Sequence, residues 1–177
     1  MTGDAGRGVS ALDLVPGDEL RVRLRSCCAA DAWVEAVMGG RPYASEAELL
    51  AESDRATAEL DAAGLAQALA GHPRIGDKTA AAHGSDGRSA AWSRGEQAGV
   101  TGAATGLLDE LAAANAAYEE RFGHVYLVCA SGRGADELLA VCRARLGNDP
   151  ATERGVVLEE LAKINQLRLT KLLGEER

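Results

Sequence analysis

The sequence predicts an all-α protein, a single-domain helical bundle of about seven to nine helices with one short buried extended segment. The chain has 177 residues, which is the size of one domain. Hydrophobic residues make up 46% of it but aromatic residues only 3%, so Ala, Leu and Val must build the core. Ala and Leu favour helices. Apolar residues recur at helical spacing along most of the chain, and only residues 125–130 have the pattern of a strand.

The N-terminal half contains several helix start signals. Residues 1–10 are rich in glycine and are expected to form a disordered tail, which leaves 11–177 as the domain. Helices are predicted to begin near Pro16 and at Asp31. Ser45 and Glu48 fit a capping box, in which a side-chain oxygen and a carboxylate satisfy free N–H groups at the start of a helix.

His72 lies between two residues that restrict the backbone. A short helix is predicted over 62–70, with Asp61 as its cap and Gly71 as its end. Pro73 prevents the helix from resuming and holds the residue before it extended. His72 is therefore a candidate for acid–base chemistry, although a lone histidine is more often structural.

A Gly-, Ser- and Ala-rich loop is expected over 79–92, and a helix is predicted to begin at Ser93. Ser93 and Glu96 fit a second capping box. The box is either purely structural or part of an anion site at a helix N-terminus, where Gln97 adds a side-chain amide. Further along, one apolar stripe that ends at Gly123 includes the following residues: Leu107, Leu111, Asn115, Tyr118 and Phe122.

The C-terminal part is predicted to contain a helix over 135–146 and a long last helix from Pro150 to about 173. In the last helix Arg168 falls in the middle of an apolar stripe, Val157, Leu161, Ile164 and Leu172. A guanidinium on a buried face needs an anionic or polar partner. Arg168 is therefore in an internal ion pair, or its stem is buried with the charged end in water, or it lies in a pocket where it binds a carboxylate.

Charge and cysteine usage exclude several classes of protein. The net charge is −8 and basic residues alternate with acidic ones, which argues against nucleic acid or an anionic membrane as a partner. The chain has neither an apolar run long enough to span a bilayer nor a visible secretory signal. Four cysteines without a Cys-x-x-Cys pair and three histidines without ligand spacing predict no metal site. We expect a cytoplasmic protein with reduced thiols.

Three further residues are of types that can carry chemistry. His83 is expected to be solvated in its loop, and His124, which follows a helix end, is either structural or functional. Cys129 with a histidine could form a nucleophile pair, which would make the protein a Cys129-dependent hydrolase. Its apolar surroundings favour an inert thiol instead. A non-enzymatic helical interaction module is the other alternative.

An ordered set of motifs resembles the 2-oxo-4-hydroxy-4-carboxy-5-ureidoimidazoline (OHCU) decarboxylases of urate breakdown. The resemblance covers roughly residues 11–173. Its motifs are Cys27-Cys28 with Trp33, Arg41-Pro42-Tyr43, His72-Pro73 with Gly76 and Lys78, Ser93-x-x-Glu96-Gln97, Asn115-x-x-Tyr118, Phe122-Gly123, Val128-Cys129-Ala130 and Leu167-Arg168-Leu169.

The resemblance implies a cofactor-free carboxy-lyase that converts OHCU to (S)-allantoin and CO₂, with an all-α fold and usually a homodimeric assembly. It implies that His72 is the catalytic acid and Glu96 its partner. The implied substrate-binding residues are Pro73, Ser93, Gln97, the backbone of Tyr126, Leu127, Val128, Cys129 and Ala130, and Arg168.

Overall fold

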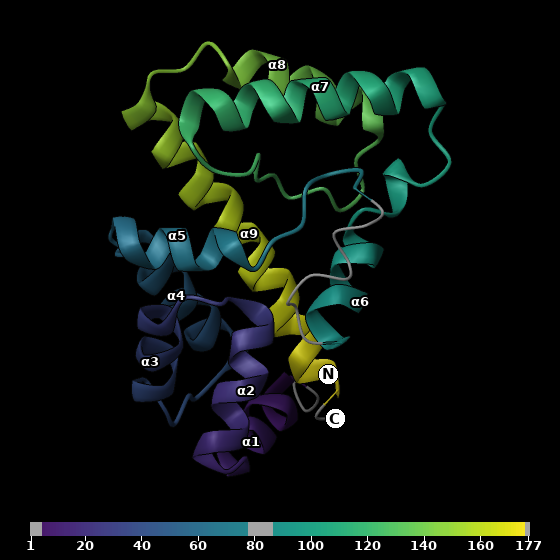
Figure 1. The fold of residues 1–177 in the computed structure, drawn as a ribbon. Coiled ribbons are helices and arrows are strands. Elements are labelled where there is room, and N and C mark those ends of the chain that lie inside the picture. The colour runs from purple at the N-terminus through teal and green to yellow at the C-terminus, as the bar shows by residue number, and fades with distance from the viewer. Residues whose placement is uncertain (1–4, 78–86, 176–177) are drawn as a thin grey trace. The chain divides into compact units, whose positions relative to one another are not determined.

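The structure, a computed structural model, describes residues 5–77 and 87–175 (Figure 1). This part of the chain contains nine α-helices, one short 3-10 helix and no β-strand, which confirms the predicted all-α fold class. The helices are α1 Ala5–Leu14, α2 Gly17–Cys27, α3 Asp31–Gly39, α4 Glu46–Ala58, α5 Ala62–Ala70, α6 Gly87–Glu96, α7 Thr105–Phe122, α8 Ala135–Arg145 and α9 Pro150–Glu175, and the 3-10 helix η2 is Ala98–Val100. None of these helices combines the length and the apolar composition that crossing a bilayer requires.

The chain divides into two compact units, which we describe separately. Unit 1 contains the residues up to 68 and those from 162 onward, and unit 2 contains residues 69–161. Helix α9 contributes its first part to unit 2 and its second part to unit 1. The predicted domain 11–177 therefore comprises two compact units.

In unit 1, α3 packs against both α2 and α4, and α1 packs against α4. Trp33 is fully buried, and its indole N–H donates to the carbonyl and hydroxyl oxygens of Ser53, both at 3.2 Å. The predicted disordered tail is wrong from Ala5 onward, because α1 begins there. Val9 and Leu12 lie three residues apart on one helical face and are both buried, which stabilises a helix that its glycines disfavour.

Side-chain caps fix several helix starts as predicted. The Glu48 N–H donates to the Ser45 hydroxyl at 3.2 Å, and the Glu48 carboxylate accepts from the Ala44 N–H at 2.8 Å. Asp61 accepts from the Gly64 N–H at 2.7 Å, and Asp149 caps the first turn of α9. These bonds satisfy N–H groups that have no partner within their own helix.

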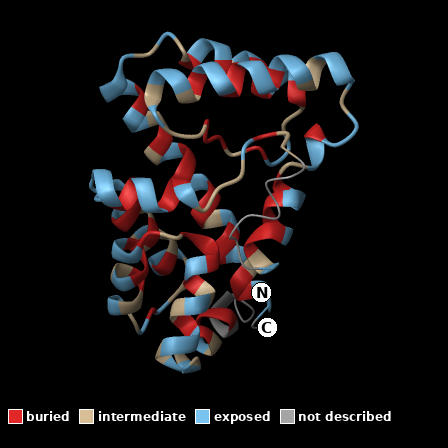
Figure 2. Cartoon of the chain, viewed as in Figure 1, coloured by how far each residue is buried: buried red, intermediate tan, exposed pale blue. Residues whose placement is uncertain are grey.

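In unit 2, α7 and α8 lie side by side and share a core with the extended segment, residues 125–130 (Figure 1). Figure 2 shows that α7 and α8 expose one face to solvent while the segment is largely buried. The core includes Leu111, Tyr118, Tyr126, Val128 and Leu138. The structure confirms the prediction of a buried extended segment without a paired strand, because residues 125–130 pair with no strand in the described part of the chain and four of them are buried.

Candidate functional site

The end of α5 places His72. The helix ends at Ala70, and the His72 N–H donates to the carbonyl of Leu69 at 3.0 Å. His72 and Pro73 are both partly buried. The backbone of His72 is therefore restricted by the end of a helix on one side and by a proline on the other.

Two side-chain amides hold the loop that follows His72. The Gly76 N–H donates to the side-chain oxygen of Gln97 at 2.9 Å, and the Asn115 amide donates to the carbonyl of Ile75 at 2.8 Å. Gly76 has φ of 81°, a left-handed conformation that glycine adopts without strain. The loop of residues 73–77 is thus fixed to the end of α6 and to α7.

The capping box predicted at Ser93 and Glu96 is wrong. Helix α6 begins at Gly87, so both residues lie in its last turn, and the Gln97 N–H donates to the carbonyl of Ser93 at 3.1 Å. There is consequently no helix N-terminus at Ser93 to bind an anion. Residues 87–92 of the predicted loop belong to α6, whereas its residues 79–86, including His83, lie outside the described ranges.

Glu96 lies close to the extended segment. It is 9% exposed, and its charge is one of the causes that raise the pKa of the Cys129 thiol, after burial and the charge of Glu160. A raised pKa disfavours the thiolate that a nucleophilic cysteine needs. The environment of Cys129 therefore argues against the hydrolase alternative.

The elements that carry Gln97 and the extended segment meet at Gly99. A Cβ atom on Gly99 would lie 2.1 Å from the carbonyl oxygen of Arg133, closer than any real contact. Glycine at this position lets η2 approach the turn that follows the extended segment, where the Arg133 N–H donates to the carbonyl of Ala130 at 3.0 Å.

Side-chain hydrogen bonds hold the backbone of the extended segment. Arg145 donates to the carbonyl of Leu127 at 2.7 Å, and the Cys129 N–H donates to the carboxylate of Glu160 at 2.8 Å. The Tyr126 hydroxyl donates to the carbonyl of Leu138 at 3.0 Å. Arg145 and Glu160 were not among the predicted site residues. The sequence did contain a signal for Glu160: it is a charged residue at the edge of the apolar stripe of α9, directly before Leu161.

Arg168 lies in unit 1 and is 2% exposed, so its predicted position on the buried stripe of α9 is confirmed. Its guanidinium donates to the carbonyls of Ser26 and Cys27 at 3.4 and 3.5 Å, at the end of α2. Carbonyls at a helix C-terminus carry partial negative charge and suit a cation. The two carbonyls are therefore hydrogen-bond partners of Arg168 within unit 1.

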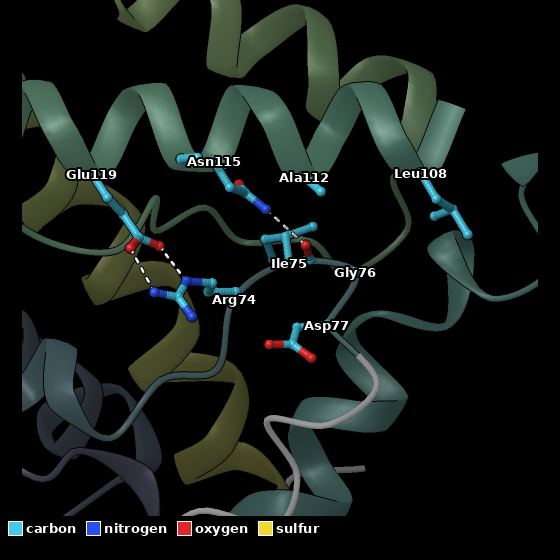
Figure 3. Close-up of a pocket in the computed structure, with 9 residues that line it drawn as sticks. Arg74, Ile75, Gly76, Asp77, Leu108, Ala112, Asn115 and Glu119 are labelled. Carbon is cyan, nitrogen blue, oxygen red and sulfur yellow. Dashed lines mark hydrogen bonds and ion pairs between the residues drawn. The ribbon is translucent and has the colours of Figure 1, made fainter. Parts of the chain in front are cut away.

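A pocket of about 340 Å³ lies between α7 and the loop that the two amides hold (Figure 3). Asn115 contributes one wall, and an ion pair between Arg74 and Glu119, with one contact of 2.7 Å, closes one end. None of the predicted site residues lines this pocket. Its lining residues are Arg74, Ile75, Gly76, Asp77, Leu108, Ala112, Asn115, Ala116 and Glu119.

Comparison with known proteins decides the family. The family model described as OHCU decarboxylase matches residues 14–170, which is most of the chain and extends into both units. The chain belongs to the OHCU decarboxylase family. The resemblance drawn from the motifs is thereby confirmed.

Relatives of the OHCU decarboxylase family show the same likeness. The 2-oxo-4-hydroxy-4-carboxy-5-ureidoimidazoline decarboxylase of Amia calva is 36% identical over 140 residues, which cover 78% of each chain. The uric acid degradation bifunctional protein TTL of Arabidopsis thaliana is 28% identical over 150 residues, which cover 85% of this chain and 46% of that protein. A crystal structure of OHCU decarboxylase in the presence of (S)-allantoin shares the fold, with a TM-score of 0.71 and 23% identity over 86% of this chain and 98% of that one.

Proposed function

We propose that this protein catalyses the decarboxylation of OHCU to (S)-allantoin and CO₂, as a carboxy-lyase of urate and purine catabolism. The observation that carries the proposal is the match to the OHCU decarboxylase family over residues 14–170. The relative from Amia calva, which is named as an OHCU decarboxylase, supports it at 36% identity.

The chemistry of OHCU needs no cofactor. The bond between the carboxyl group and the ring carbon that carries the hydroxyl breaks, and CO₂ leaves. The electron pair moves toward the neighbouring C=N, so the negative charge develops on the ring nitrogen. The neighbouring carbon, which carries the ureido group, then takes a proton. The hydroxyl becomes the carbonyl of allantoin, and the proton that it loses neutralises the ring nitrogen. Because that carbon becomes the stereocentre, the enzyme must deliver the proton to one face.

We assign the proton delivery to His72, with Glu96 as its partner. Imidazole exchanges protons near neutral pH, and general acid–base catalysis typically contributes about 10²–10⁴-fold. Support comes from the restricted backbone of His72 and from the Gln97 contact that holds the loop after it. Glu96, at the end of α6, lies one residue before Gln97.

We assign substrate binding to Pro73, Ser93, Gln97 and the backbone of residues 126–130. Buried backbone amides in a fixed extended segment suit a flat, polar ligand such as OHCU. The contacts from Arg145 and Glu160 support a fixed backbone there. Arg168 is proposed to bind the carboxylate of OHCU, an assignment that rests on the family resemblance and on the burial of its guanidinium.

Two further assignments accompany this function. We propose a homodimer, which light scattering would detect as a particle of twice the 18.3 kDa chain mass. We also propose a cytoplasmic location, which agrees with four cysteines that form no disulfide. Fractionation of cells that express the tagged full chain tests this location.

The deciding experiment is circular dichroism of allantoin made from freshly generated OHCU. The expected result is rapid formation of the (S)-enantiomer in excess, with the enzyme treated beforehand with a chelator. Racemic product at the spontaneous rate would overturn the proposed function.

A further inference from the structure

The extended segment has an unusual source of hydrogen bonds. Its residues are largely buried, and buried backbone groups need partners that a neighbouring strand would normally supply. Here two of the partners are charged side chains: Arg145 from α8 binds the Leu127 carbonyl, and Glu160 from α9 binds the Cys129 N–H. Between these two residues, the backbone groups of Val128 have no partner among residues 5–77 and 87–175.

Arg145 is itself held on several sides. It is 6% exposed and pairs with Glu153, which is fully buried, at 2.6 Å. The Tyr118 hydroxyl donates to the same carboxylate, and the Asn148 amide donates to its other oxygen at 2.8 Å. A buried ion pair stabilises a fold only when its remaining hydrogen bonds are satisfied, as they are here. The guanidinium that binds Leu127 therefore has little freedom to move.

Helix α9 carries on one face both glutamates that hold the extended segment. Glu153 and Glu160 are seven residues apart, which is close to two helical turns, and both belong to the part of α9 in unit 2. Glu153 acts on the segment through Arg145, and Glu160 acts on it directly. One rigid helix thus sets the positions of residues 127 and 129 together.

We infer that Glu160 and the Arg145–Glu153 pair are positioning residues for the decarboxylase reaction: they fix the backbone of residues 127–129 in the geometry that binds OHCU. This inference rests on the proposed function and adds residues that do not themselves touch the substrate. A displaced segment misaligns the ring relative to the proton donor. Loss of an anchor therefore raises KM and lowers the enantiomeric excess of allantoin.

Substitution at Glu160 separates the hydrogen bond from the charge. Glu160→Gln keeps an acceptor oxygen for the Cys129 N–H, whereas Glu160→Met fills a similar volume without one. We expect Glu160→Met to raise KM about tenfold, the size of one lost hydrogen bond to a charged group, and to lower the enantiomeric excess. The KM of Glu160→Gln should stay within about threefold of the wild-type KM. Glu159→Met is the matched control, because Glu159 is the exposed neighbour on the same helix.

Hydrogen exchange of the Cys129 amide gives a readout that is independent of activity. We expect faster exchange in Glu160→Met than in Glu160→Gln and in the control. The double variant Arg145→Met with Glu153→Met serves if Glu160→Met does not fold, since it removes the Leu127 anchor without leaving an unpaired buried charge. We expect this double variant to fold, to have a higher KM than the wild type and to give allantoin of lower enantiomeric excess.

The outcomes distinguish the two proposals. Wild-type protein that yields only racemic allantoin overturns the proposed function and this inference with it. Wild-type protein that is stereoselective, with folded Glu160→Met and double variants of unchanged KM and enantiomeric excess, overturns the positioning role alone.

Discussion

Gly76 donates its backbone N–H to the side-chain oxygen of Gln97 at 2.9 Å, and this bond joins the loop after His72 to the end of α6. The two residues are 21 positions apart, and the segment between them includes residues outside the described ranges. The bond fixes residue 76 of this loop to the end of α6.

Replacing His72 tests the proposed proton donor. We expect His72→Asn to lower kcat by about 10²-fold or more and to abolish the enantiomeric excess of allantoin. Steady-state kinetics and circular dichroism of the product are the measurements. His124→Asn is the control, since His124 packs against Tyr118 and Phe122 and has no assigned role. Activity retained in His72→Asn would refute the assignment.

Asn115 tests the second amide that holds the loop. Asn115→Leu leaves the buried Ile75 carbonyl without its donor, which should lower the free energy of unfolding by about 1–3 kcal/mol. Because the loop then loosens, kcat should fall as well. Urea unfolding and kinetics measure both effects. Wild-type stability and kcat in this variant would show that Gln97 alone is sufficient to hold the loop.

Gly99 tests the close approach of η2 to the turn at Arg133. In Gly99→Ala the new methyl group would meet a backbone carbonyl that cannot rotate away, so we expect a loss of about 1–3 kcal/mol. The control is Gly95→Ala, where nothing lies within 4 Å and alanine favours the helix. Urea unfolding should therefore move the two midpoints in opposite directions. Equal midpoints would contradict the predicted clash.

The lowered pKa of Glu153 makes the free energy of unfolding depend on pH. Burial alone would raise the pKa of its carboxyl, but hydrogen bonds from Arg145, Tyr118 and Asn148 outweigh burial, and the pKa lies below its usual value. A lowered pKa in the folded state stabilises the protein above the ordinary pKa of glutamate, about 4.3. This stabilisation is lost as the pH falls through the lowered value.

Glu153→Gln should therefore be less stable than the wild type at pH 7, because Arg145 loses its ionised partner. Its stability should also decline less steeply in acid. Urea unfolding between pH 7 and pH 3 measures both. Parallel stability curves for the two proteins would contradict the assigned ion pair, and Glu159→Gln is the exposed control.

Cys129 tests the hydrolase alternative. Burial, Glu160 and Glu96 raise the pKa of its thiol, so little thiolate forms at neutral pH. We expect Cys129→Ala to keep kcat for OHCU within about tenfold of the wild type, since only the backbone of residue 129 is assigned to the substrate. A complete loss of activity in a folded Cys129→Ala variant would favour a nucleophilic cysteine.

Local sequence signals predicted most of the helices. Ser45, Asp61 and Asp149 fixed helix starts because a cap and its N–H partners lie within four residues of each other. The stripe of α9 predicted the burial of Arg168 for a similar reason. Such signals depend on neighbours along the chain and survive in the folded protein.

The errors arose where long-range packing decided the structure. Glycines between residues 1 and 10 suggested disorder, but burial of Val9 against the rest of unit 1 favours α1. The pattern Ser93-x-x-Glu96 fits a helix start, yet α6 begins six residues earlier and places both residues in its last turn. The anchors Arg145 and Glu160 act on residues 18 and 31 positions away, and no local pattern encodes such a pairing.

Because side chains outside the extended segment hold its backbone, ligand binding by that backbone need not depend on which side chains the segment carries. If the peptide groups of residues 127–129 bind the ligand, then substitutions of Leu127 and Val128 that preserve packing leave the binding groups in place. New substrate preferences would then arise from changes at the anchors, which reshape the segment as a whole. Directed evolution of this enzyme for other ureido compounds should accordingly begin at positions 145, 153 and 160 rather than in the segment itself.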